Sequence, residues 1–144
     1  MKIDWYGADP CFWYPLERDA RTQLPERFAV SYGPGVLRYQ IYRLDVPGDE
    51  LQHDLTIEFW KVPPYPTLGL PAEDYPRIFT SVKRRRNHVF DDGSLCVWQP
   101  RDPEVRRWTS RLGLLVLVEM VRRHLLLEMD WFVTGVWAIE DVPH

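Results

Sequence analysis

The sequence predicts an α+β fold in which a four-stranded antiparallel meander packs on one long central helix. One observation is the distribution of the 13 prolines, most of which lie in the first hundred residues and divide them into short segments suited to strands and turns. Another is an apolar segment after residue 102, whose hydrophobic residues recur near helical spacing. Because 144 residues match the size of one ordinary domain, we expect residues 1–144 to share a single core.

Short runs of β-branched and aromatic residues predict the strands of the meander. The first run follows the turn at Gly33-Pro34-Gly35, and the second alternates apolar and polar residues, so the two form a hairpin. Five prolines in residues 63–76 remove backbone donors and predict a surface loop before the third strand. The predicted strands are residues 36–46, 55–62, 77–86 and 94–98.

A helix of 20 to 27 residues is predicted from Asp102, which can cap it, with Pro103 in the first helical position. We expect it to end near Asp130. Residues 112–118 leave almost no polar face, so this helix should cross the sheet and be covered on both sides, with the tail folding back over it. Before residue 30, residues 16–28 are compatible with a short amphipathic helix interrupted at Pro25.

Composition excludes several classes of function. The net charge of -3 gives no general attraction to nucleic acid or to an anionic membrane, and no apolar run approaches the ~20 residues of a membrane span. We therefore expect a cytoplasmic protein, with Cys11 and Cys96 as free thiols. The sequence contains no CxxC pair, P-loop or GxGxxG motif, and its histidines lack ligand-like spacing, so we expect neither a metal nor another cofactor.

Cys96 is the candidate nucleophile, since a thiol both attacks a carbonyl and leaves it readily once it is partly ionised. It follows a polar turn at Asp91-Asp92-Gly93. A nearby His88 is the candidate partner, because its imidazole can favour the thiolate or bind a developing oxyanion. The alternatives are a buried small hydrophobe at position 96 and a loop histidine at position 88. The basic run at 83–86 is either an anion site or a solvated sheet edge.

The order of elements and two short motifs resemble ubiquitin-conjugating enzymes over roughly residues 36–130. Tyr75-Pro76 stands before a strand, and Gly93-Ser94-Leu95-Cys96 is similar to the family's Gly-x-Ile-Cys. The family's His-Pro-Asn positions are filled here by Arg86, Asn87 and His88, counted back from the cysteine. A shorter turn would instead align His88 with the family's histidine. In either alignment the family's asparagine is missing, and His88 is the candidate replacement.

The sequence looks most like a diverged bacterial branch of that family, found in CBASS antiviral operons beside a cGAS-like nucleotidyltransferase. Its closing TGVWAIEDVPH is similar to the ending of those proteins. The resemblance implies a thioester between Cys96 and the C-terminus of a protein partner, which would be that nucleotidyltransferase, followed by transfer to an amine. Activation of the carboxyl group would then need a separate ATP-using enzyme or a partner acting in its place.

Two other functions remain open. A catalytically inactive member of the same fold would serve as a protein-binding module, as the missing asparagine suggests. A thiol hydrolase has a candidate base in His88 but no clear third member of a triad. The acceptor, the oligomeric state and any role of Cys11 do not follow from the sequence.

Overall fold

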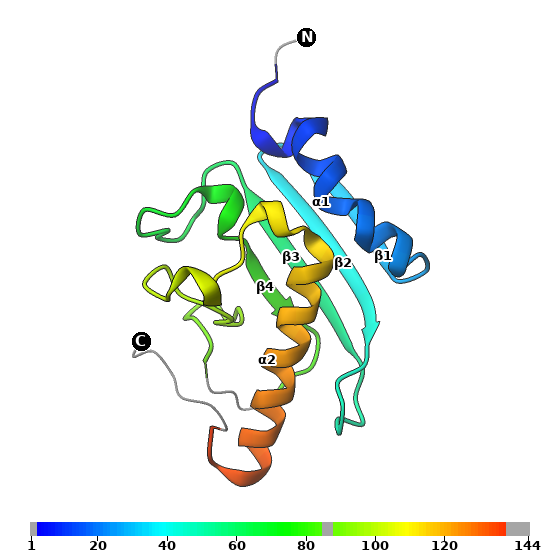
Figure 1. Ribbon diagram of the computed structural model, residues 1–144, viewed down its shortest axis with the longest axis vertical. Coiled ribbons are helices and arrows are strands. Elements are labelled where there is room, and N and C mark those ends of the chain that lie inside the picture. The colour runs from blue at the N-terminus through cyan, green and yellow to red at the C-terminus, as the bar shows by residue number, and fades with distance from the viewer. Residues whose placement is uncertain (1–2, 85–87, 138–144) are drawn as a thin grey trace.

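The computed structural model describes residues 3–84 and 88–137 (Figure 1). Its strands and α-helices are α1 (Pro10–Gln23), β1 (Phe28–Gly33), β2 (Val36–Leu44), β3 (His53–Trp60), β4 (Arg77–Thr80) and α2 (Leu114–Thr134). Four short 3-10 helices accompany them: η1 (Tyr6–Ala8), η2 (Ala72–Asp74), η3 (Glu104–Arg106) and η4 (Ser110–Leu112).

The four strands form one antiparallel sheet in the order β1-β2-β3-β4, and α2 crosses one face of it (Figure 1). α1 lies beside the upper end of α2, on the β1–β2 side. The predicted α+β class, with an antiparallel four-stranded meander and a long helix, is confirmed. No described helix has the length and apolarity needed to cross a membrane.

The strands that make up this meander differ from the prediction at both ends. Residues 94–98 form no strand and contribute only an isolated bridge between Val89 and Leu95. The missing strand is β1, which pairs with β2 across the turn that holds Gly35 at a φ of 76°. The third predicted strand ends at Thr80 rather than 86, and residues 85 and 86 lie outside the described chain.

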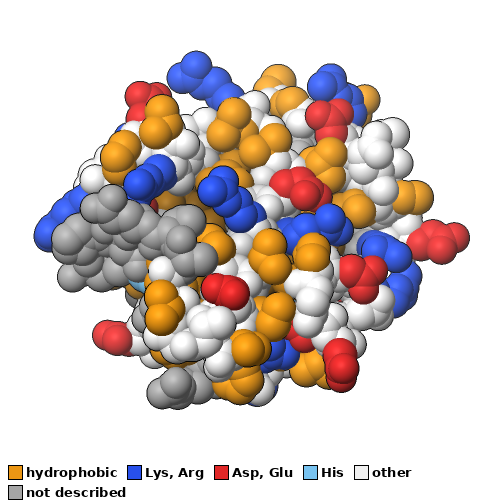
Figure 2. All heavy atoms as spheres, turned by 60° about the horizontal axis from the view of Figure 1, so that its bottom comes forward, with side chains coloured by type: hydrophobic (Ala, Val, Ile, Leu, Met, Phe, Trp, Pro, Cys, Tyr) orange, Lys and Arg blue, Asp and Glu red, His pale blue; other side chains and the backbone are white. Residues whose placement is uncertain are grey.

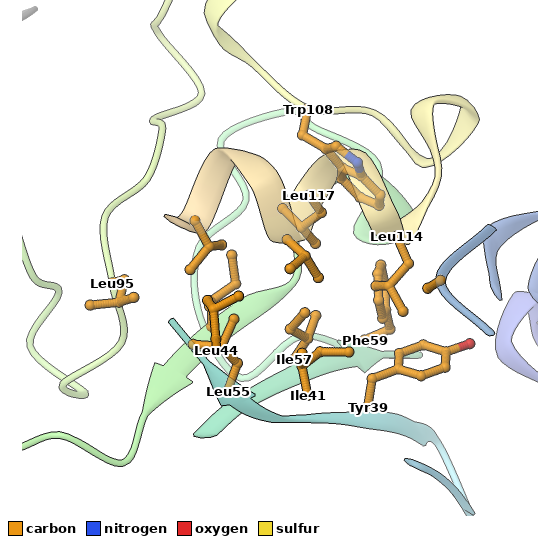
Figure 3. Close-up of a cluster of buried hydrophobic side chains, with 14 of the residues drawn as sticks. Tyr39, Ile41, Leu44, Leu55, Ile57, Phe59, Leu95, Trp108, Leu114 and Leu117 are labelled. Atoms are coloured by element: carbon orange, nitrogen blue, oxygen red, sulfur yellow. The ribbon is translucent and has the colours of Figure 1, made fainter. Parts of the chain in front are cut away.

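The core lies between the sheet and α2 (Figure 3). Alternate residues of β2 and β3 point toward the helix because side chains alternate across a strand. Ile57 and Phe59 on β3 thereby face Leu114 and Leu117 on α2, with Trp108 closing the upper end. Burial of these apolar surfaces is the main force that holds α2 on the sheet.

The long helix begins eleven residues later than predicted, at Leu114 rather than Pro103. Asp102 accepts a hydrogen bond from the Gln99 amide at 2.8 Å, so its carboxylate closes a local turn instead of capping a helix. Two 3-10 turns follow, and Gly113 at a φ of 84° precedes the first residue of α2. The helix then runs to Thr134, beyond the expected end at Asp130.

The outer side of α2 is partly open, so the prediction that both sides are covered is wrong: Val116 is 41% exposed. The described part of the tail does return toward the helix, since Trp137 packs against His124. The rest of the tail, residues 138–144, lies outside the described chain. The predicted amphipathic helix is α1, which starts earlier, at Pro10, with Asp9 capping the Cys11 amide at 2.9 Å.

Candidate functional site

A segment between β4 and α2 carries both predicted site residues. The Leu95 amide donates to the Ile78 carbonyl of β4 at 2.8 Å, which fixes the segment to the edge of the sheet. The next amide, that of Cys96, donates to the carbonyl of His88 at 2.7 Å. The structure therefore places the backbones of Cys96 and His88 side by side. Their separation in the sequence alone does not require this contact.

The polar turn between His88 and Cys96 is confirmed. Gly93 has a φ of 85°, a conformation that favours glycine, and its amide donates to Phe90 at 2.9 Å. Asp92 accepts hydrogen bonds from both the amide and the hydroxyl of Ser94. These contacts close a short, tight loop that brings Cys96 back to His88.

The thiol of Cys96 is buried, with 5% of the residue exposed. Its Sγ lies 4.0 Å from the carbonyl oxygen of Trp98, and its chain neighbour Leu95 is part of the core. Tyr75 is also near: burial raises the pKa of this phenol, Arg77 acts in the opposite direction, and Cys96 adds to the rise. The sulfur thus sits among aromatic and polar groups as well as the edge of the apolar core.

His88 lies in a cluster of rings at the C-terminal half of α2. Its imidazole packs on Trp137 with ring centroids 4.3 Å apart and meets His124 nearly edge-on at 6.3 Å. His124 in turn has its Nε2 3.4 Å from a carboxylate oxygen of Glu128, and both of these α2 residues are buried. The backbone of His88 has a φ of 41°, which a side chain other than glycine rarely adopts. The ring of His88 is therefore held from two sides.

Arg77 ties the loop to the sheet and to the proline-rich segment. Its guanidinium carbon lies 3.9 Å from the ring centroid of Tyr65 and 4.1 Å from that of Phe90, so the cation is sandwiched between two aromatic faces. Its Nε is 3.2 Å from Asp92 in the polar turn. A buried arginine thereby joins the surface loop, β4 and the turn before Cys96.

Other residues singled out in the sequence lie elsewhere. Cys11 is exposed on α1. In the basic run, Lys83 is exposed, whereas Arg84 pairs with Asp49 at 3.2 Å. Residues 85–87, which include two of the family's motif positions, lie outside the described chain. Within the described chain, no three His, Cys, Asp or Glu side chains gather as a metal site would require.

Sequence reasoning missed Arg77, His124, Glu128 and Trp137 as site residues. The signal for His124 and Glu128 was present, since an ionisable pair four residues apart on the apolar side of a helix faces the interior. Arg77 opens a strand that otherwise reads as apolar, and its burial depends on aromatic partners that are distant in sequence. Only the fold brings those partners together.

No protein-family model matches the chain, and no curated protein matches its sequence.

Proposed function

We propose that the protein is a ubiquitin-conjugating-like enzyme that carries the C-terminus of a protein partner as a thioester on Cys96 and transfers it to an amine. The observation that carries the proposal is the hydrogen bond from the Cys96 amide to the His88 carbonyl, in a loop fixed between β4 and α2. That position in the order of elements is where the resembled family has its cysteine. The partner expected from the resemblance is a cGAS-like nucleotidyltransferase in a bacterial antiviral operon.

The chemistry assigned to Cys96 has two steps. The thiolate attacks an activated C-terminal carbonyl, and the activating group leaves as the thioester forms. An amine then attacks the thioester and loses a proton to solvent, the amide bond forms, and the sulfur leaves as thiolate. Each attack places negative charge on the carbonyl oxygen, which a donor can stabilise by about 3 kcal/mol.

His88 is the residue we assign to that stabilisation, in place of the family's missing asparagine. Trp137 and His124 restrict its ring, and restriction of a catalytic side chain lowers the entropy lost on reaching the transition state. We assign the orienting of that second ring to Glu128, whose carboxylate oxygen lies 3.4 Å from the Nε2 of His124. We regard His124 and Glu128 as positioning residues that act through His88.

A buried thiol must become accessible before it reacts. The chain from residue 88 to 113 contains only an isolated bridge and two 3-10 turns, apart from its loops, and such segments open at low free-energy cost compared with a core helix. Docking of the partner's C-terminus between this segment and the sheet edge would supply the opening. Localisation in the cytoplasm, where thiols stay reduced, belongs to the same proposal.

Trapping of the intermediate tests the proposal. The variants Cys96→Ser and Cys96→Lys should form a stable ester or isopeptide adduct with the partner in cells, seen as a mass increase equal to that protein. Cys11→Lys is the matched control, and it should form no adduct. Absence of adduct at position 96 in cells that contain the partner would contradict the acyl-carrier role.

A second candidate is a binding module without catalysis, and the 5% exposure of Cys96 favours it. In that case Cys96 fills space at the edge of the core, and Cys96→Ala should leave partner affinity and cellular activity unchanged. Loss of cellular activity in a folded Cys96→Ala variant would exclude the binding module.

A further inference from the structure

The outward side of α2 combines exposed apolar residues with two charges of opposite sign. Val116 is exposed, and Met120 and Leu127 are partly exposed, at the spacing that places residues on one helix face. Glu119 and Arg123 lie on the same face, four residues apart and exposed. We call this set the α2 stripe, and it extends from Val116 to Leu127, roughly 16 Å along the helix.

The stripe borders a shallow hollow of about 390 Å³ lined by Leu115, Val116, Glu119, Met120 and Arg123. Contact between apolar side chains and water is unfavourable, so a partner surface that covers them lowers the free energy. On the face of the molecule shown in Figure 2, hydrophobic side chains lie in small groups among charged ones. All residues that line the hollow come from α2, so the stripe is a narrow surface, and a single helix is the element of matching width.

The two charges on the stripe are available to a partner. In residues 3–84 and 88–137, neither Glu119 nor Arg123 forms a side-chain hydrogen bond or an ion pair. Glutamate four residues before arginine is a spacing that often gives an ion pair within one helix. Here both side chains extend separately into solvent beside the hollow.

The order of residues on the stripe is complementary to itself in the antiparallel direction. A two-fold axis across α2 near Val121 sets Glu119 of one copy beside Arg123 of the other, and the same contact occurs twice. The same axis sets Val116 opposite Leu126, next to Leu127 of the stripe, and it brings the two Met120 side chains close to the centre. Methionine suits this place because its flexible side chain adapts to irregular packing.

We propose that the α2 stripe is a homodimer surface, in which two copies of this chain pack their α2 helices antiparallel. The occupant of the hollow is the segment from Glu119 to Leu127 of the second copy. A contact made by one pair of helices of this length buries less than about 800 Å² per copy, so the dimer should be reversible and dependent on concentration. The proposal concerns a surface separate from Cys96 and does not depend on the acyl-carrier role.

Charge reversal tests the two-fold arrangement. Because the contact between Glu119 and Arg123 occurs twice in the dimer, Glu119→Arg alone or Arg123→Glu alone disrupts both contacts. Either variant should weaken the dimer roughly tenfold, measured by sedimentation velocity over a wide range of concentration. The variant that carries both reversals should recover the affinity of the unmodified protein. A mixture of the two single variants should form a heterodimer, since one then carries two positive and the other two negative charges. Glu50→Arg, an exposed residue of the β2–β3 turn, is the matched control and should change nothing.

Val116→Asp tests the apolar part of the stripe. The variant should be folded, as measured by circular dichroism, and monomeric, as measured by sedimentation velocity. A protein that stays monomeric at every concentration would overturn the proposal. So would single reversals that dimerise as tightly as the unmodified chain, or a double reversal that fails to recover. Binding of a different protein to the stripe without self-association would likewise assign the surface to another partner.

Discussion

The core between the sheet and α2 and the segment from residue 88 to 113 are held by different forces. In the core, side chains such as Ile57 and Leu117 are fully buried and act through apolar area, which has no directional requirement. The site segment depends on directed contacts: a sandwiched Arg77, carboxylate-closed turns and one bridge at Val89. Regular structure thus fixes the fold, and individual polar contacts fix the position of Cys96.

Removal of apolar volume from the core should have the largest effect. Leu117 is fully buried on α2, so Leu117→Ala should lower the free energy of unfolding by about 3 kcal/mol through lost burial and an incompletely filled cavity. Urea denaturation measures the change. Val116→Ala on the neighbouring, exposed position is the control and should cost far less. Equal losses at the two positions would contradict the assigned faces of α2.

Loss of the Arg77 sandwich should loosen the site segment with a smaller effect on the whole protein. Arg77→Met keeps much of the volume but removes the cation from between Tyr65 and Phe90, which should cost about 2 kcal/mol. Amide hydrogen exchange of residues 88–98 should rise more than that of β2 and β3.

The matched control for Arg77 is Arg38→Met. Arg38 pairs with Glu58 at 2.7 Å on the more open face of the sheet, and an exposed ion pair contributes at most about 1 kcal/mol. If Arg38→Met and Arg77→Met gave the same exchange pattern, Arg77 would have no special role in holding the loop.

These contrasts explain how far the sequence alone could predict the molecule. The hairpin of β2 and β3 follows from alternation, and the turn at Gly93 from its residue types. β1 escaped prediction because it is an edge strand with mostly half-buried residues, so its alternation is weak. The late start of α2 depends on Asp102 bonding to Gln99, a choice between two local hydrogen bonds that propensity does not decide.

The candidate site was predictable only where local residue types determine the structure. The residue types of the turn before Cys96 predicted the loop, and the contact with His88 follows from a hairpin-like closure of that loop. The rings that hold His88 belong to His124, at the middle of α2, and to Trp137, both far from His88 in the sequence. Such contacts depend on the angle at which α2 crosses the sheet, which no local pattern encodes.

A smaller, pH-dependent effect is expected at Asp49, which lies in the β2–β3 turn and pairs with Arg84. Burial alone would raise the pKa of this carboxyl, but hydrogen bonds from His53, the Leu51 amide and Arg84 outweigh it and hold the pKa below the ordinary value. A carboxyl with a lowered pKa in the folded state stabilises the protein above its ordinary pKa near ~4, and that contribution is lost as the pH falls further.

The free energy of unfolding of the Asp49→Asn variant should therefore be about 1 kcal/mol lower at neutral pH and should fall less steeply below pH ~4. Urea denaturation at several pH values measures both effects. Asp45→Asn is the control, since among the described residues the exposed Asp45 carboxylate accepts a side-chain hydrogen bond only from Gln52. A variant at position 49 with the same acid dependence as the unmodified protein would contradict the assigned role of Asp49.

The rate of alkylation of each cysteine in the folded protein tests the central claim most directly. Mass spectrometry after brief treatment with iodoacetamide at neutral pH reports Cys96 and the exposed Cys11 separately. The account predicts that Cys96 reacts more slowly than the exposed Cys11 because of its burial, but far faster than global unfolding allows, and that urea removes the difference between the two. Modification of Cys96 only at the rate of global unfolding would contradict the account and leave a structural cysteine.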